Sequence, residues 1–173
     1  QGKSGIVSIE ATDSISFDGF STGIFNDVFP DSIANGSDIQ LKAKSISLTN
    51  GAVLKTSNAG QGNAGNVVIN AGDRVLFDTG DILSNVGSSD GTPAEGNVGS
   101  ISISAKNVSL KGTENNAAQI QAGFFSNTKG KAGIVSIEAT DSISFDGLNT
   151  GIYASVDPNS FGNGSDIQLK ARS

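Results

Sequence analysis

The chain has 173 residues, of which 17 are acidic, 11 are basic and 23 are glycine, and it contains neither cysteine nor histidine. Its net charge of −6 and its scattered basic residues argue against binding to nucleic acid or anionic lipid. The missing residue types exclude disulfides, thiolate metal sites, a cysteine nucleophile, the commonest general base and the usual zinc ligand. No apolar run approaches the length of a membrane span, so no membrane insertion is expected.

The chain contains an internal repeat. The stretch GKSGIVSIEATDSISFDG at Gly2 returns as GKAGIVSIEATDSISFDG at Gly130, and residues 2–45 align with 130–173 without a gap at about three quarters identity. The pattern also restarts at shorter intervals of 28 to 34 residues, which is typical of a solenoid with variable loops. Residues 1–173 are therefore expected to form a single solenoid, with coils beginning near Gly2, Ala34, Gly62, Gly96, Gly130 and Gly162.

Each coil contains three segments in which apolar and polar residues alternate, and a period of two is typical of strands. The inward residues of the first strand are predicted to be Val7, Ile9, Ala11; Ile39, Leu41, Ala43; Val67, Ile69, Ala71; Ile101, Ile103, Ala105; Val135, Ile137, Ala139; and Ile167, Leu169, Ala171. Those of the second are Ile15, Phe17; Ile46, Leu48; Val75, Phe77; Val108, Leu110; and Ile143, Phe145. Those of the third are Ile24, Leu54, Leu83, Ile120 and Ile152. A three-sided coil with a dry interior follows.

Polar positions between these columns should become lateral neighbours on adjacent coils. This places Glu10 beside Lys42, Glu138 beside Lys170, and Lys111 between two aspartates. A solvated surface whose charges avoid repulsion explains the pattern better than a binding site does. At the coil corners, Gly5, Gly65, Gly99 and Gly133 are expected to supply positive φ angles, as are the neighbouring asparagines Asn63, Asn97 and Asn163.

Two site chemistries compete with a purely structural interpretation. Asp13, Asp73 and Asp141 recur near the first corner, with Arg74 beside Asp73, and clustered carboxylates are what a polysaccharide-cleaving β-helix needs. Lysines occupy the same corner in intervening coils, which separates the carboxylates. Asp and Asn abound in the turns, yet the known calcium-binding repeat motifs are missing. No catalytic residue, metal site or cofactor is therefore expected.

Aromatic residues fall in or near the longest loops: Phe20, Phe25, Phe29, Phe124, Phe125, Tyr153 and Phe161. The favoured interpretation is that they cap the third face and fill the wider coils. The alternative is an exposed aromatic strip that stacks on sugar rings or contacts another protein, with candidate contacts at Phe25, Phe29, Phe124, Phe125 and Tyr153. Burial decides between the two.

The units GNAGNVVINAGDRVLFD and GSDIQLKAKSISLTNGAVLKTSNAGQGNAGN resemble the repeats of filamentous-haemagglutinin-type exoproteins of two-partner secretion systems, particularly cyanobacterial members. The resemblance covers essentially the whole chain. It implies a right-handed parallel β-helix, here of about five and a half coils, and export through an outer-membrane transporter that recognises a secretion domain not seen in this sequence. It also implies location at the cell surface, as an adhesin or its stalk.

The resulting expectation is a non-catalytic structural or adhesive segment of a large secreted protein, with a carbohydrate-binding or polysaccharide-cleaving β-helix as the alternative. Expected partners are the secretion transporter and a polysaccharide or the surface of a host or neighbouring cell. The chain is expected to be a fragment of a longer array without natural caps. Since its terminal coils would be open sheet edges, end-to-end self-association is also expected.

Overall fold

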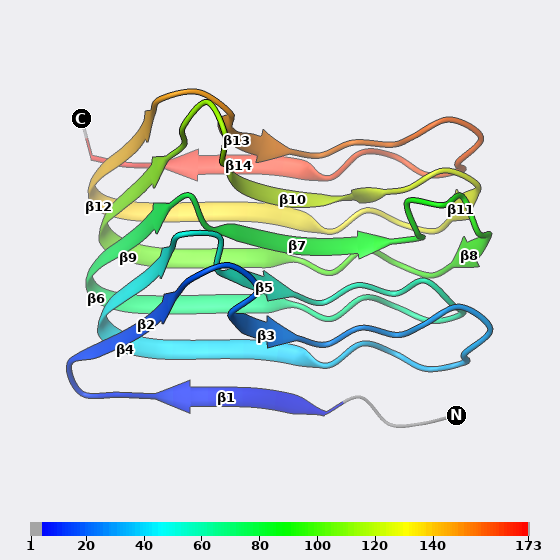
Figure 1. Cartoon of the computed structure of the whole chain (residues 1–173), viewed down its shortest axis with the longest axis horizontal. Coiled ribbons are helices and arrows are strands. Elements are labelled where there is room, and N and C mark those ends of the chain that lie inside the picture. The colour runs from blue at the N-terminus through cyan, green and yellow to red at the C-terminus, as the bar shows by residue number, and fades with distance from the viewer. Residues whose placement is uncertain (1–4, 173) are drawn as a thin grey trace.

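The computed structural model describes residues 5–172 and shows an all-β parallel solenoid of about five turns with three parallel sheets. In Figure 1 the strands of the nearer sheet run to the right and those of the farther sheet run to the left as the chain climbs, so the coil is right-handed. The predicted fold class is confirmed. No helix in the described part of the chain is long and apolar enough to cross a membrane.

Most of the regular structure lies in a seven-stranded sheet. Its strands are β1 (Ile6–Glu10), β2 (Ser14–Asp18), β4 (Asp38–Thr49), β6 (Val67–Asp78), β9 (Ile101–Lys111), β12 (Ile134–Asp146) and β14 (Asp166–Lys170). The first two predicted strands of a coil merge into one long strand in β4, β6, β9 and β12. Three of the pairings between these strands shift register at the corner, for example between Ala43 and Ser45, so a bulge bends the strand without ending its hydrogen bonding.

The other two sheets complete the coil. A five-stranded sheet contains β3 (Gly23–Phe25), β5 (Val53–Lys55), β7 (Asp81–Val86), β10 (Ala118–Phe124) and β13 (Thr150–Tyr153). A two-stranded sheet contains β8 (Ala94–Glu95) and β11 (Thr128–Lys129). Isolated parallel bridges extend that small sheet to Gln61 and Phe161 in neighbouring coils. Sequence analysis did not assign these strands, because they are too short to show an alternating pattern.

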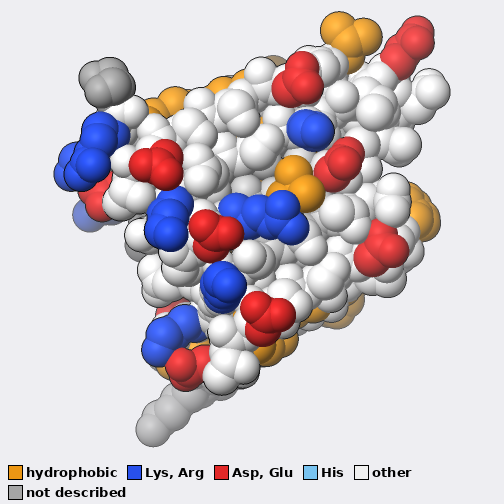
Figure 2. Space-filling view, turned by 90° about the vertical axis from the view of Figure 1, so that its left-hand side faces the viewer, with side chains coloured by type: hydrophobic (Ala, Val, Ile, Leu, Met, Phe, Trp, Pro, Cys, Tyr) orange, Lys and Arg blue, Asp and Glu red, His pale blue; other side chains and the backbone are white. Residues whose placement is uncertain are grey.

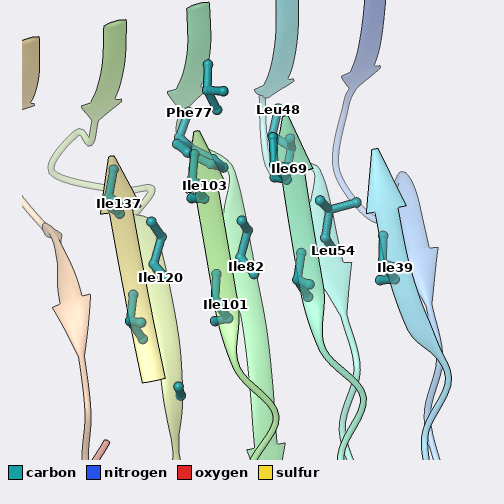
Figure 3. Packing of buried hydrophobic residues seen from close by; sticks show 14 of the residues in the cluster. Ile39, Leu48, Leu54, Ile69, Phe77, Ile82, Ile101, Ile103, Ile120 and Ile137 are labelled. Carbon is teal, nitrogen blue, oxygen red and sulfur yellow. The ribbon is translucent and has the colours of Figure 1, made fainter. Parts of the chain in front are cut away.

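The predicted apolar columns form the interior of the central coils, whereas Phe145, Ile167 and Leu169, also predicted to face inward, are exposed in the last coils. Ile39 pairs with Val7 and Val67 in register, and Leu41 pairs with Ile9 and Ile69. Figure 3 shows residues of these columns pointing into the space between the facing sheets. In the central coils these side chains are almost fully buried, including Ile39, Leu41, Leu48, Ile69, Phe77, Ile101, Ile103 and Leu110. Coil stacking therefore converts a short alternating pattern into a continuous core.

The third column contains one wrong prediction. Ile82, and not Leu83, pairs with Leu54 and Ile120 and is fully buried. Leu83 pairs with Lys55 and Gln121 on the outer face of the five-stranded sheet. Both residues are apolar and adjacent, so alternation alone could not decide which of them faces the core.

The prediction for the corner glycines is also wrong. Gly65, Gly99 and Gly133 are not among the residues with positive φ, and neither are Asn63, Asn97 and Asn163. The glycines are needed for another reason: a Cβ on Gly99 would overlap the Gly65 carbonyl of the coil before it, and a Cβ on Gly133 would overlap the Gly99 carbonyl. At Gly99 and Gly133 the coils approach too closely for a side chain, whereas Ser37 and Ser165 occupy the equivalent position in the second and last coils.

The corner asparagines form a ladder between coils. The Asn63 side-chain oxygen accepts a hydrogen bond from the Asn97 backbone nitrogen at 2.9 Å, and the Asn97 oxygen accepts one from the Lys131 nitrogen at 3.0 Å. The Asn35 oxygen accepts the equivalent bond from the Asn63 nitrogen at 2.9 Å. These side chains satisfy backbone groups in turns where no strand partner exists.

The predicted charge neighbours are confirmed on the outer face of the seven-stranded sheet. Lys42 Nζ lies 2.7 Å from Glu10 Oε1, and Lys170 Nζ lies 3.7 Å from Glu138 Oε1. Lys111 pairs with Asp78 and Asp146 in register. All four members of the two ion pairs are mostly exposed, so each pair contributes little to stability.

Asp18 should make the stability of the first coil depend on pH. Its carboxylate accepts hydrogen bonds from Thr49 Oγ1 at 2.6 Å and Asn50 Nδ2 at 2.7 Å, and these bonds lower the pKa of Asp18. A carboxyl whose pKa is lower in the folded state stabilises the fold above its unfolded pKa, and this contribution is lost as pH falls through the folded pKa. We expect wild type to have a higher urea midpoint than Asp18→Asn at pH 7, and the difference to shrink as the pH falls below the ordinary range of an aspartate pKa.

Thr49→Val removes the first of these donors and should reduce the same pH dependence. Parallel urea curves for wild type and Asp18→Asn, with the same separation at pH 7 and at these lower pH values, would contradict the assignment.

Candidate binding groove

The outer face of the five-stranded sheet carries a row of unlike side chains. Phe25, Lys55, Leu83, Gln121 and Tyr153 are lateral neighbours in that order, one from each strand. The residues just before them, such as Ile24, Leu54 and Ile120, face the core. The same alternation that builds the core therefore places an aromatic, a cation, an aliphatic, an amide and a phenol side by side outside it.

A groove of about 350 Å³ lies on this face. Its floor includes Lys55, Ser57, Leu83, Asn85 and Gln121. Its walls come from three loops: Asp27 to Pro30 after β3, Gly87 to Ser89 after β7, and Phe125 after β10. The groove thus draws on four successive coils, and at roughly 4.8 Å per coil it extends about 14 Å along the solenoid axis.

Local backbone geometry positions both aromatic walls. Phe29 begins a turn that the Ser32 nitrogen closes onto the Phe29 carbonyl, with Pro30 and the positive φ of Asp31 at its centre. At the other end, Gly87 has a φ of 99°, and a Cβ there would lie 2.9 Å from Phe125 Cβ. Glycine at this position lets the loop after β7 pass close to Phe125.

The groove holds one ion pair and two polar atoms without partners. Lys55 Nζ lies 3.2 Å from Asp27 Oδ2, and both side chains are partly buried. Among the described residues, no group hydrogen-bonds to Asp27 Oδ1 or to Ser57 Oγ, and both atoms are covered. Asn85 is held in place because its Oδ1 accepts a bond from the Gly123 nitrogen at 3.1 Å. The ion pair leaves the groove without net charge, and two covered polar atoms of its lining residues lack a hydrogen-bond partner among the described residues.

The structure separates the five predicted contact residues. Phe29 is 71% exposed and, together with the half-buried Phe125, lines the groove. Phe25 is exposed beside a smaller hollow of about 220 Å³, and Tyr153 is exposed at the far end of the same row of side chains. Phe124 is only 2% exposed, so its prediction as a surface contact is wrong. Its ring packs inward over Gly130, where a Cβ would lie 3.2 Å from it.

The polar half of the groove was not predicted from the sequence. Asp27, Lys55, Ser57, Asn85 and Gln121 were not singled out as site residues. Lys55 and Gln121 could have been found by extending the alternation outward from Leu54 and Ile120. The others depend on loop positions that the period of the core does not determine.

The corner near Asp13, Asp73 and Asp141, where carboxylates were predicted, carries charges of both signs and no acidic cluster among the described residues (Figure 2). Figure 2 faces this side of the molecule and shows Lys and Arg side chains interleaved with Asp and Glu. Lys106 Nζ lies 3.7 Å from Asp73 Oδ1, so a lysine of the next coil neutralises that carboxylate. Within residues 5–172, no three acidic side chains lie close enough together to hold a metal ion. A shallow hollow here of about 550 Å³ is lined by charged residues of both signs, alanines and small polar residues.

No protein-family model, no curated protein and no solved structure matches this chain. The coil architecture and the groove are therefore the observations from which a function is inferred.

Proposed function

We propose that this chain is a non-catalytic structural or adhesive segment of a large secreted cell-surface protein, serving as part of an adhesin stalk. The observation that carries the proposal is the uninterrupted lateral pairing of coils. From β1 to β14 each long strand pairs in parallel register with the next, so the solenoid forms a continuous rod. A solenoid lengthens by adding coils, each stabilised by its neighbour, and a projecting stalk needs this property.

The distribution of side chains supports the same role. The central core is mainly apolar, and its few buried polar side chains, such as Thr56, Asn58 and Ser84, hydrogen-bond to backbone carbonyls. The outer charges of the seven-stranded sheet pair with opposite charges on adjacent coils. Such a charged surface is well hydrated, and its ion pairs between coils are distributed along the solenoid axis. The sequence resemblance adds the expected route: export through an outer-membrane transporter, followed by display at the cell surface.

Surface display can be tested with antibodies raised against the folded segment. We expect them to label intact cells of the source organism, and we expect brief protease treatment of those cells to remove the signal. An antibody against a cytoplasmic protein serves as the control for leakage. Labelling that requires permeabilised cells would contradict the proposal.

A further inference from the structure

We propose that the groove on the outer face of the five-stranded sheet binds the neutral sugar rings of a short stretch of uncharged polysaccharide. This function goes beyond the structural role, and it holds whether or not the solenoid is a surface stalk. The groove, the ion pair and the unpaired atoms carry the argument.

The groove recognises its ligand through side chains. Its floor lies on the middle strands β5, β7 and β10, whose backbone groups already pair with neighbouring strands on both sides. A peptide added as a further strand has no free edge to join at this place. The groove offers aromatic and aliphatic walls together with hydroxyl, amide and charged groups, and this mixture suits a ligand with apolar ring faces and many hydroxyl groups.

Phe29 and Phe125 supply the apolar surfaces. They stand on coils one and four, at opposite ends of the groove, with Leu83 between them. The face of a pyranose ring carries C–H groups, which pack against the electron-rich face of an aromatic ring. An extended oligosaccharide lying along the solenoid axis contacts both phenylalanines at once.

The charge of the groove favours a neutral ligand. Asp27 and Lys55 lie 3.2 Å apart and neutralise each other, so an anionic sugar gains little and must compete with Asp27 for the lysine. A sugar hydroxyl can donate to the carboxylate while a neighbouring hydroxyl accepts from the ammonium. The pair thus matches adjacent hydroxyls on one ring.

The two unpaired atoms point to a missing partner. A buried polar atom without a hydrogen bond is costly, and each such atom in a native structure needs an explanation. Asp27 Oδ1 and Ser57 Oγ belong to residues that line the groove, and Ser57 is only 7% exposed. In this proposal, a ligand hydroxyl seated in the groove is the missing partner of these atoms.

The internal repeat shows that the architecture does not demand these residues. In the second copy, Ser155 takes the place of Asp27 and Asp157 the place of Phe29. The inward residue is unchanged, since Ile24 corresponds to Ile152. Val28 and Pro30, which also line the groove, return as Val156 and Pro158, so the loop is repeated while its carboxylate and its aromatic ring are not.

The test is an NMR titration of the whole 173-residue chain with cellotriose, maltotriose, mannotriose and galactotriose, using trigalacturonate as the anionic probe. We expect at least one neutral trisaccharide to shift the amide signals of Lys55, Leu83 and Gln121 saturably. Phe29→Ala should weaken this binding by about tenfold, which corresponds to the loss of one stacking contact. Phe20→Ala, at an aromatic side chain that is 88% exposed and does not line the groove, should leave it unchanged.

A charge variant separates ligand binding from a merely structural role. Asp27→Asn keeps the side-chain size but leaves Lys55 without its counter-ion, so it should weaken binding of the neutral sugar and strengthen binding of trigalacturonate. The proposal is overturned if none of the neutral trisaccharides shifts these amides saturably. It is also overturned if Phe29→Ala binds as well as wild type, or if the wild-type chain prefers trigalacturonate.

Discussion

Leu41→Ala should lower the free energy of unfolding by about 3 kcal/mol, within the range for deleting a buried leucine side chain. Leu41 is 1% exposed and lies between Ile9 and Ile69 in the same apolar column. The coils on either side are held by continuous backbone pairing, so they cannot close around the cavity. The cost is therefore the lost burial together with an unfilled space.

Leu169→Ala is the matched control, because Leu169 is the equivalent of Leu41 in the internal repeat. Leu169 pairs with Ile137 on one side but is 49% exposed, since no described coil covers it. We expect a loss of about 1 kcal/mol, in proportion to the smaller buried area. Urea denaturation followed by circular dichroism measures both variants, and equal losses would contradict the role of coil stacking.

Gly99→Ala should destabilise the solenoid by about 3 kcal/mol or more, although it adds a single methyl group. The new Cβ would overlap the Gly65 carbonyl and lie 2.7 Å from Ser84 Oγ. The Gly65 oxygen already accepts hydrogen bonds from Thr56 Oγ1 at 2.6 Å and Ser84 Oγ at 3.1 Å. Making room for the methyl group separates two coils and leaves these buried hydroxyls without their acceptor.

Gly72→Ala makes the same chemical change at an open position. The nearest atom to its Cβ would be Lys44 Cα at 3.8 Å, which is an ordinary contact, and Gly72 is exposed. We expect stability within about 0.5 kcal/mol of wild type, or slightly higher, because alanine restricts the unfolded chain. If thermal melts of the two variants show equal losses, the inter-coil clash is not the cause.

These predictions distinguish the inner layer of the molecule, formed by the core and the inter-coil glycines, from its outer surface. The inner layer tolerates few changes, because each side chain or glycine is set by the coil before and after it. The outer layer on the five-stranded sheet is less restricted, and this is where the two copies of the internal repeat diverge most, as at Phe29 and Asp157. Binding residues can vary there without disturbing the rod.

Much of the fold could be predicted because a strand alternates with a period of two and a coil repeats that alternation. Once Ile39 is aligned with Val7 and Val67, the register follows as far as the corner bulge, including the outward pair Glu10 and Lys42. The prediction failed where this logic is ambiguous. Ile82 and Leu83 are both apolar, so the pattern fits either residue facing inward.

The glycines and the aromatics show a second kind of failure. Glycine is compatible with a positive φ and with a close backbone approach, and sequence cannot tell which of these Gly99 serves. Phe124 and Phe125 are adjacent, yet one fills the interior and the other lines the groove. Their environment is set by the path of the chain around the corner.

The solenoid fold and most of its apolar core follow from the sequence, because both depend on local alternation repeated at a regular interval. Only the tertiary structure decided where the groove lies, since Asp27, Lys55, Asn85 and Phe125 come from four different coils. These four residues line one groove because of how loops of unequal length fold over the five-stranded sheet. Loop conformation follows from turn geometry and packing, and neither has a period that the sequence could reveal.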